Sequence, residues 1–524
     1  MVKIQNKLLK ASVVLALLCF VVMSATYAQP LNWQHLDLHK DGVFGISTDK
    51  AYKELLKGKT ATKIKVAVLD SGIDTQHEDL SAIIWRNPIE QPNGIDDDHN
   101  GYIDDLNGWN FLGDIDQENI ELTRLVRKYE QFFSGPDSAR RVTKSKEDFR
   151  EYQKLKANLE EKQKEAIKEL AGISHVKNLV DSLVTVTGKN NPKSRDFKAL
   201  KGQNDGEDYF ISVIAEELKT QSLKQVYDKL FNKTIDYYLE EIGYRLNPGY
   251  NTRKILGDDE NNPHEKHYGN NNVIGPDALH GTHVAGIIGA VRDNKKGIDG
   301  IADQVEIIPV RCVPNGDERD KDVANAIRYA TDMGAKVINM SFGKSFSPDK
   351  KVVDEAVRYA LSKDVLLVHA AGNENLDLEK ETAYPSKKFL NGELASAWIE
   401  VGASTYKADS TLKASFSNYG QTIVDVFAPG ESIYSTVPGS AYQIESGTSM
   451  AAPVVSGLAA LIRSYYPKLT APQVKDIILK SVIPFEKEVL VEVGGEEQKV
   501  PFSSLSISGG VVNAYNALLL AESY

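Results

Sequence analysis

The chain of 524 residues contains only two cysteines, no long basic tract and no long apolar run. Cys19 lies in an N-terminal segment that we predict to be removed, so Cys312 would then be alone and no intramolecular disulfide could form. We expect Cys312, which lies in a strand-like run, to be a buried apolar filler. The net charge is −11, which gives no electrostatic footprint for nucleic-acid binding. A fold without disulfides must be held by its core and by any metal that it binds.

The N-terminus has the pattern of an export signal. Lysines precede an apolar run at residues 11–22, and a small-x-small cleavage site ends at Ala28. The apolar run is too short for a stable membrane span. We therefore predict a signal peptide at residues 1–28 and export to the periplasm or the medium. Residues 29–63 are expected to form an N-terminal arm.

A serine stands at the start of a predicted helix. Residues 446–449 read Ser-Gly-Thr-Ser, and an apolar stretch with Pro453 in its first turn follows them. A helix N-terminus offers free backbone N–H groups and the positive end of the helix dipole. These features suit a nucleophile at Ser449 and the oxyanion that would develop beside it. An ordinary Ser/Thr helix cap is the alternative interpretation of this stretch alone.

Other stretches supply the groups that a nucleophilic serine requires. Residues 63–69 read as a buried strand that ends on Asp70, and His280-Gly-Thr-His283 opens a helix of small residues. A serine needs a base to accept its proton, and the base needs a carboxylate to fix its tautomer. A further buried strand leads to Asn373, whose side-chain amide can donate a hydrogen bond.

Taken together, these motifs closely resemble those of the subtilase family of serine proteases. The chain order of acid, base and serine is the order found in subtilisin. The resemblance covers roughly residues 64–111 and 270–524, and it implies that His283 is a helix-packing residue. It also implies four catalytic roles: acid Asp70, base His280, nucleophile Ser449, and oxyanion donor Asn373 together with the N–H of Ser449.

The resemblance implies how a peptide or protein substrate would bind. Ser341-Phe342-Gly343 follows a predicted strand at residues 336–340 and matches the edge at which a substrate of subtilases adds as an extended strand. The implied activity is that of a serine endopeptidase that forms an acyl-enzyme intermediate. The sequence leaves open the preferred side chains, the natural substrate and the oligomeric state.

Strands and helices alternate after His280 at βα spacing, which predicts a parallel sheet. The expected fold class is α/β, with a subtilisin-like parallel sheet covered by helices on both faces. Residues 113–270 interrupt this pattern with dense mixed charge and apolar residues at three- and four-residue steps, which predicts an inserted helical subdomain. The catalytic domain would then consist of residues 64–112 and 271–524. The insertion is expected to gate access or select substrates.

Residues 93–107 predict a calcium loop. Crowded carboxylates repel one another unless a hard cation lies among them, and subtilases with a similar Asp-rich loop bind calcium. The glutamate usual at the twelfth position is absent, and Asn107 stands there. A solvated acidic turn is the alternative. The predicted ligands follow the spacing of calcium loops and are Asp96, Asp98, Asn100, the carbonyl of Tyr102 and Asp104.

Two other functions fit parts of the sequence. His280, His283 and Asp70 could hold the metal of a hydrolase, although His-x-x-His lacks the i, i+4 spacing of the usual zinc helix. The second alternative is a binding protein on the same fold, with residues 113–270 as its interaction arm. A chelator, an acylating inhibitor directed at serine and a chromogenic peptide would separate the three functions. His77, on a loop with neighbouring carboxylates, is expected at the surface.

Overall fold

β1 (Ile64–Asp70) is the central strand of the fold and ends on a carboxylate. Its side chains alternate between two hydrophobic cores, with Val66 and Val68 in one and Ala67 and Leu69 in the other. This alternation is the two-residue period of a β-strand. Both faces of the strand are buried, which explains why its sequence is apolar almost throughout.

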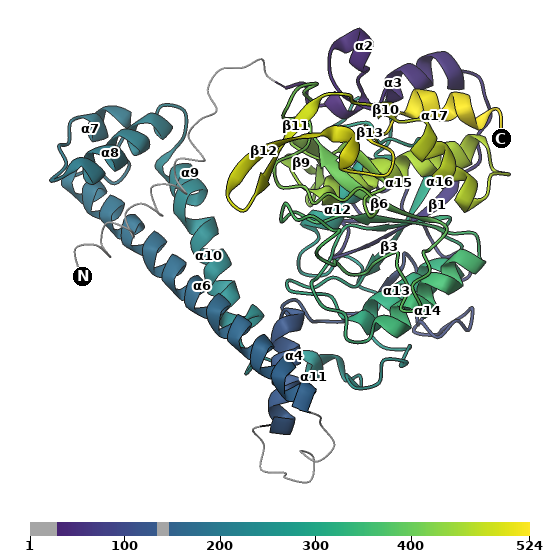
Figure 1. Cartoon of the computed structure of the whole chain (residues 1–524), viewed down its shortest axis with the longest axis horizontal. Helices are drawn as coiled ribbons and strands as arrows, with labels where there is room; N and C mark the ends of the chain where they lie inside the picture. The colour runs from purple at the N-terminus through teal and green to yellow at the C-terminus, as the bar shows by residue number, and fades with distance from the viewer. Residues whose placement is uncertain (1–28, 134–145) are drawn as a thin grey trace. The chain divides into compact units, whose positions relative to one another are not determined.

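The computed structural model describes residues 29–133 and 146–524, so the predicted signal peptide lies outside the described residues. The chain forms two compact units (Figure 1). The first, which we call the sheet unit, consists of Gln29–Glu121 and Asn251–Tyr524. The second, which we call the helical unit, includes Leu122–Tyr250.

The sheet unit contains a nine-stranded sheet with the order β10-β13-β7-β6-β5-β4-β1-β3-β2. Every neighbouring pair of strands is parallel except β10 and β13. The strands besides β1 are β2 (Trp109–Asn110), β3 (Val305–Arg311), β4 (Val337–Met340), β5 (Leu366–Ala370), β6 (Trp398–Ser404), β7 (Val426–Pro429), β10 (Ile483–Pro484) and β13 (Gly510–Val511).

Helices cover both faces of this sheet. One core joins it to α12 (Leu279–Gly289), α15 (Thr448–Tyr465), α16 (Ala471–Lys480) and α17 (Ala514–Ala521). The opposite core joins it to α13 (Asp320–Asp332) and α14 (Lys350–Ser362). Figure 1 shows α13 and α14 on one side of the sheet and α16 and α17 on the other. The predicted α/β class, with a parallel sheet covered on both faces, is confirmed.

Short elements complete the sheet unit. The segment before β1 contains short helices, and two antiparallel hairpins, β8–β9 and β11–β12, follow later in the chain. Their bounds are η1 (Trp33–His35), α2 (Leu38–Asp41), α3 (Thr48–Ala51), η2 (Tyr52–Leu56), α11 (Arg253–Leu256), β8 (Ile433–Val437), β9 (Ala441–Glu445), β11 (Glu488–Val493), β12 (Glu496–Pro501) and η5 (Phe502–Ser504).

The helical unit has a hydrophobic core of its own, in which Val180, Phe197 and Val226 are fully buried. Its longest helix is α6, with 41 residues. None of the helices within the described ranges combines the length and the apolar composition that a bilayer crossing requires. The helices are α4 (Glu121–Phe133), α6 (Lys146–Val186), α7 (Ser194–Lys198), α8 (Asp205–Glu217), α9 (Leu223–Tyr227), η3 (Asp228–Asn232), α10 (Lys233–Glu240) and η4 (Glu241–Arg245).

Candidate active site

The carboxylate at the end of β1 meets a histidine at the start of α12. Asp70 Oδ1 lies 2.8 Å from His280 Nδ1. The backbone N–H of Ser71 also donates to Asp70 Oδ1, at 2.8 Å, which helps to orient the carboxylate. A side chain at Gly281 would collide with the carbonyl oxygen of Gly72, so the glycine lets α12 approach the end of β1 closely. Asp70 thereby fixes the orientation of the imidazole.

The surroundings of His280 favour its charged form. Burial lowers the pKa of the imidazole, but the charge of Asp70 and its hydrogen bond raise it, and Glu445 and Asp277 raise it further. The resulting pKa is above the ordinary value for histidine. The side chain is 38% exposed, so the ring can be reached by a substrate.

Ser449 is the second residue of α15 and is held next to the end of β4. Its hydroxyl donates to the carbonyl of Ser341 at 3.0 Å. The hydroxyl of Ser341 donates in turn to the carbonyl of Ser449 at 2.9 Å. These reciprocal bonds tie the start of α15 to the segment after β4. In this arrangement the proton of the Ser449 hydroxyl points to the carbonyl of Ser341, so the hydroxyl must rotate before the proton can pass to a base.

Asn373 follows β5, and its side chain contacts the same helix start. Its Oδ1 accepts hydrogen bonds from the N–H of Thr448 at 2.8 Å and from the hydroxyl of Thr448 at 3.0 Å. A carbon built on Gly447 would lie 3.5 Å from Asn373 Nδ2 and 3.6 Å from the nitrogen of Ser449. Asn373 Nδ2 and the backbone nitrogen of Ser449 therefore both lie near Gly447 at the N-terminus of α15.

The predicted substrate edge rests on a buried histidine that the sequence interpretation did not include. Ser341 is buried, Phe342 is half-buried and Gly343 is exposed. His369 Nε2 donates to the carbonyl of Phe342 at 2.8 Å, and its Nδ1 lies 2.7 Å from Glu400 Oε1. Burial lowers the pKa of His369, but the Glu400 charge and hydrogen bond outweigh it and raise the pKa. A protonated ring, which donates from both nitrogens, fits these two acceptors.

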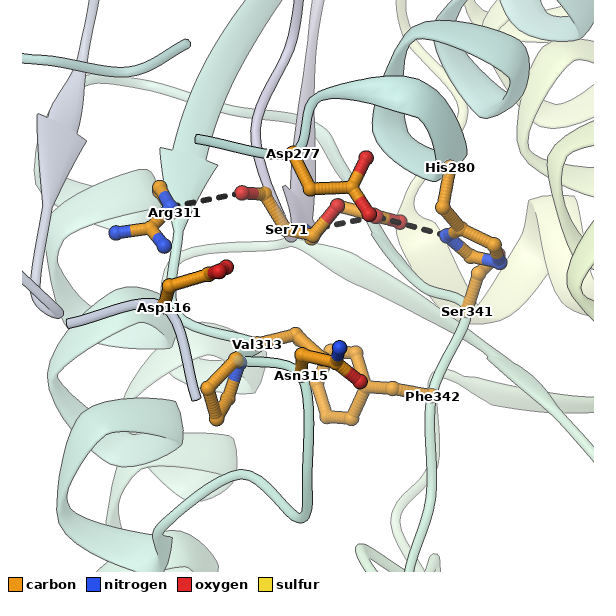
Figure 2. Close-up of a pocket in the computed structure, with 11 residues that line it drawn as sticks. Ser71, Asp116, Asp277, His280, Arg311, Val313, Asn315, Ser341 and Phe342 are labelled. Carbon is orange, nitrogen blue, oxygen red and sulfur yellow. Dashed lines mark hydrogen bonds and ion pairs between the residues drawn. The ribbon is translucent and has the colours of Figure 1, made fainter. Parts of the chain in front are cut away.

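A cavity of about 240 Å³ adjoins His280 (Figure 2). It extends from Asp70 and His280 to the predicted substrate edge, because Ser341 and Phe342 also line it. The remaining lining residues come from the end of β1, from the segments after β2 and β3 and from the residues before α12, and they are Asp70, Ser71, Asp116, Asp277, Arg311, Val313, Pro314 and Asn315.

Two other histidines near the site, His77 and His283, are buried and contact backbone carbonyls. The expectation that His77 is a surface residue is wrong, since it is fully buried, with Nδ1 accepting from the N–H of Asp79 and Nε2 lying 3.1 Å from the carbonyl of Ala441. His283 is buried, as expected of a helix-packing residue, and burial lowers its pKa to about 4. The Nε2 atom of His283 does not face His280, because it lies 3.1 Å from the carbonyl of Ile433 and 3.2 Å from that of Gln443.

The acidic loop brings three of its predicted ligands together. Asp96 and Asp98 both accept a hydrogen bond from the N–H of Asn100, at 3.0 and 3.1 Å. The N–H of Tyr102 donates to the side chain of Asn100 at 2.8 Å, and the ring of Tyr102 is buried. Asp104 faces the other way, because its carboxylate accepts hydrogen bonds from the backbone of Asn93 and Gly94. The carboxylates of the loop thus accept hydrogen bonds from backbone N–H groups of the same loop.

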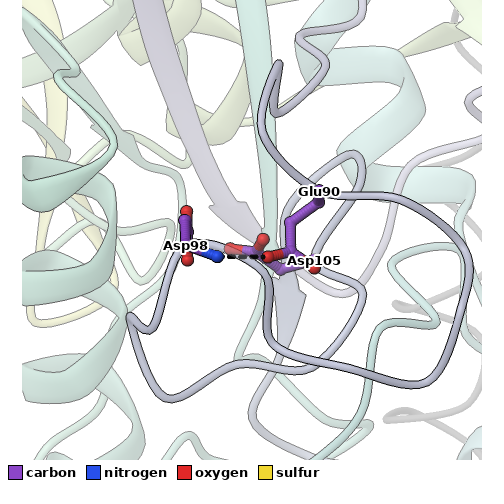
Figure 3. Close-up of side chains that lie close together, drawn as sticks. All are labelled: Glu90, Asp98 and Asp105. Atoms are coloured by element: carbon purple, nitrogen blue, oxygen red, sulfur yellow. Dashed lines mark hydrogen bonds between the residues drawn. The ribbon is translucent and has the colours of Figure 1, made fainter.

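The spacing of the calcium-loop pattern does not reveal a second cluster of carboxylates in this region. Glu90, Asp98 and Asp105 offer oxygens that all lie within 4.8 Å of one another (Figure 3). Glu90 and Asp105 are buried, and burial raises the pKa of Asp105 to about 6. Oxygen ligands are those that calcium prefers, so the chemistry of this group fits a hard cation. Glu90 lies outside the twelve-residue pattern, and only its proximity in the fold reveals it.

The sequence is similar to those of a family of known proteins. A family model described as the subtilase family, Peptidase_S8, matches residues 61–502. The thermophilic serine proteinase of Bacillus sp. strain AK1 is 44% identical over 186 residues, which are 35% of this chain and 42% of that protein. Thermitase of Thermoactinomyces vulgaris is 45% identical over 186 residues, 35% of this chain and 61% of thermitase. The matches thus span less than two thirds of either relative.

A solved structure described as proteases from Pseudoalteromonas arctica PAMC 21717 shares 27% identity, covers 48% of this chain and 79% of that chain, and superposes with a TM-score of 0.40. The family assignment rests on the sequence match instead. Asp70, His280 and Ser449 lie at the carboxyl edge of a parallel sheet, which is the organisation of a subtilisin-like protein. This chain belongs to the subtilase family.

Proposed function

We propose that this protein is a serine endopeptidase with the catalytic residues Asp70, His280 and Ser449. The observation that carries the proposal is the 2.8 Å contact between Asp70 Oδ1 and His280 Nδ1. The cavity beside this pair reaches Ser341, and the Ser449 hydroxyl donates a hydrogen bond to the carbonyl of Ser341. The contact leaves Nε2 of His280 as the nitrogen that can accept a proton. Membership of the subtilase family supports the same roles.

The proposed reaction uses these groups in two halves. The Ser449 oxygen forms a bond to the scissile carbonyl carbon while its proton passes to His280 Nε2, and the charge on the carbonyl oxygen is held by Asn373 Nδ2 and the N–H of Ser449. His280 then gives the proton to the leaving amine as the C–N bond breaks. Water, which His280 deprotonates, then attacks the ester on Ser449. This step releases the carboxylic acid half of the substrate and restores the Ser449 hydroxyl.

The substrate is proposed to bind as an extended strand along Ser341, Phe342 and Gly343. The exposed backbone at Gly343 and the buried support of Phe342 by His369 favour this edge. A strand that pairs there through backbone hydrogen bonds presents its carbonyl to Ser449. The partner is therefore a peptide or an unfolded segment of a protein.

Removing the nucleophile tests the function. Ser449→Ala should reduce hydrolysis of a chromogenic peptide to background with an unchanged melting temperature. Ser446→Ala is the matched control, because this serine lies in the same turn and only accepts a hydrogen bond from the N–H of Ser432. Asn373→Ala should lower kcat by about 10²–10³, the loss seen when such a donor is removed from subtilisin. Equal activity of the Ser449→Ala and Ser446→Ala proteins would overturn the assignment and favour a binding function.

We propose that the protein is exported and that its signal peptide is cleaved after Ala28. The lysines and the apolar run at residues 11–22 support this proposal. N-terminal sequencing of the exported protein should read from Gln29. A mature start after about residue 63 would instead make the arm a propeptide.

We also propose that calcium binds the acidic loop and stabilises the fold. Asp96, Asp98 and Asn100 from the loop, with Glu90 and Asp105 beside them, would hold the ion, which would neutralise the crowded carboxylates when bound. Thermal unfolding with added calcium and with a chelator tests this. The melting temperature should fall with the chelator, and Asp98→Ala should remove the difference. If both conditions give the same melting temperature in the native sequence, the loop is an acidic turn without a metal.

A further inference from the structure

The residue that follows the predicted substrate edge is a buried lysine. Gly343 is exposed, whereas Lys344 is 7% exposed and its side chain only 1%. Taking an ammonium group out of water is costly unless anions and hydrogen-bond acceptors replace the water. Apolar side chains of similar volume often stabilise a core as well as a buried ion pair does, so the charge at Lys344 calls for an explanation besides stability.

The ammonium group of Lys344 lies among three oxygen atoms. Nζ donates to Glu121 Oε2 and to the carbonyl of Glu318, both at 2.8 Å, and lies 2.9 Å from Asp320 Oδ1. An ammonium group has three N–H donors and can serve all three oxygens. The side chains of Glu121 and Asp320 are buried as well, at 8% and 5% exposure. These contacts are therefore shielded from water and fix the position of Nζ.

The same contacts connect two of the segments that line the cavity shown in Figure 2. The segment after β3 contributes residues 313–315 to the lining, and the substrate edge contributes Ser341 and Phe342. Further along these two segments, the side chain of Lys344 bonds to the carbonyl of Glu318. Lys344 thus ties the substrate edge to another wall of the cavity.

The backbone of the substrate edge is also held on both sides of Gly343. The N–H and the carbonyl of Lys344 bond to the backbone of Tyr384, each at 2.9 Å. His369 donates to the carbonyl of Phe342 at 2.8 Å. In an extended segment the backbone groups of successive residues point to opposite sides. The backbone groups of Gly343 would then point away from Tyr384, to the side on which a substrate strand pairs.

Glu121 connects this arrangement to the helical unit. It is the first residue of α4 and the last residue of the sheet unit before the helical unit. Its N–H donates to Asp317 Oδ2 at 2.8 Å, and the N–H of Glu118 donates to the carbonyl of Asn315 at 3.1 Å. The start of α4 is therefore fixed on the segment after β3, and Lys344 joins it to the substrate edge.

We propose that Lys344 is a positioning residue that aligns the substrate edge for pairing with a peptide, and that Glu121 and Asp320 hold its ammonium group in place. The proposal rests on the proposed peptidase function and adds a residue that does not touch the reacting atoms. Without these contacts the backbone at Gly343 would lose its alignment. Long substrates would then bind more weakly, whereas short substrates, which form fewer bonds to the edge, would be affected little.

Two chromogenic peptides measure how much a substrate gains from pairing with the edge. Both carry the same residue before the scissile bond and 4-nitroaniline as the leaving group, and they contain two or four residues. We define the length gain as kcat/KM of the longer peptide divided by kcat/KM of the shorter one. In the native protein it should be about tenfold, the size that one or two backbone hydrogen bonds provide.

Substitutions locate the effect at the buried ammonium group. Lys344→Met removes the charge, and the length gain should fall to about twofold, mainly through a higher KM of the longer peptide. Glu121→Gln keeps an oxygen that can accept from Nζ, so it should retain more of the length gain than Glu121→Leu. Asp322→Ala is the control for lost stability, because it breaks a different buried ion pair, with Arg253, and should keep the native length gain.

The outcomes separate the positioning role from the proposed function. A folded Lys344→Met protein with the native length gain would overturn the role and leave the peptidase function intact, as would a native protein that hydrolyses both peptides equally well. If Lys344→Met does not fold, a native length gain in Glu121→Leu overturns the role instead. An equal fall in Asp322→Ala would also overturn it, since lost stability would then explain the effect. If the native protein hydrolyses neither peptide, the peptidase function fails and the positioning role fails with it.

Discussion

His280 lies among carboxylates that control the pH at which its imidazole is neutral. Burial lowers its pKa, but Asp70, Glu445 and Asp277 together raise it above the ordinary value of 6.5. Only the neutral ring can take the proton of Ser449. If the proposed peptidase function holds, activity should therefore be lost on the acid side at a higher pH than an ordinary histidine pKa would give.

Glu445→Gln removes one of these charges without removing the pair with Asp70. Without the charge of Glu445, the pKa of His280 should fall, so the acid limb of the profile of kcat/KM against pH should move to lower pH. The measurement is that profile for the native protein and the variant with one peptide. Glu497→Gln, in the exposed hairpin β11–β12, is the control and should not move the limb. A shift of the Glu445→Gln profile to higher pH would contradict the electrostatic argument.

The segment that returns from the helical unit is attached to α13 by a buried ion pair. Arg253 donates to both oxygens of Asp322, at 2.8 and 2.6 Å, and the hydroxyl of Tyr268 donates to the same carboxylate at 2.6 Å. Asp322 is fully buried. These bonds explain why residues 251–270 group with the sheet unit, so the helical unit is narrower than the predicted insertion at residues 113–270.

Asp322→Ala should destabilise the sheet unit strongly. The substitution leaves the buried guanidinium of Arg253 without one of its two carboxylate partners, a change that costs about 3–5 kcal/mol in other proteins. Urea denaturation followed by the fluorescence of the tryptophans measures the free energy of unfolding. Glu355→Ala is the control, because Glu355 pairs with Arg328 at 4.0 Å on the surface and such pairs contribute about 0–1 kcal/mol. Equal losses in the two variants would contradict the role of the buried pair.

At the scale of the whole molecule, the helical unit interrupts the sheet unit without disrupting its sheet. The chain enters it after Glu121 and leaves it before Asn251. The two connections lie close together within the sheet unit, because the hydroxyl of Thr252 donates to the carbonyl of Gln117 at 3.1 Å. The proposed catalytic residues all belong to the sheet unit. The helical unit has its own core, and its predicted role in substrate selection would be separate from the proposed chemistry.

Replacing residues 122–250 with a short Gly/Ser linker tests this separation. The connections are near enough for such a linker, and turnover of a small peptide should stay within about tenfold of the native rate, or about 1.4 kcal/mol. The preference among folded protein substrates should change, because the segment that we expect to select them is gone. Kinetics with a chromogenic peptide and digestion of a folded protein are compared. A folded variant without peptide turnover would show that the helical unit supports the catalytic site itself.

Some features of the protein followed from the sequence because they are local. Asp70 ends an apolar strand, and His280 and Ser449 begin helices of small residues, so short patterns placed each of them at an element boundary. Parallel strands have their carboxyl ends at one edge, so side chains at such boundaries can be expected to meet there. The α/β class followed in the same way from the alternation of strands and helices.

Other features were decided only by the tertiary structure, because they depend on contacts between distant residues. His369 supports Phe342, and Glu90 approaches Asp105, across gaps that no helical or strand period relates. His77 is polar and flanked by carboxylates, yet β9 covers it, since the carbonyl of Ala441 lies at its ring nitrogen. The cavity at His280 likewise exists only where five separate segments converge. A local pattern specifies the element that a residue joins, whereas burial and charge pairing depend on which elements pack together.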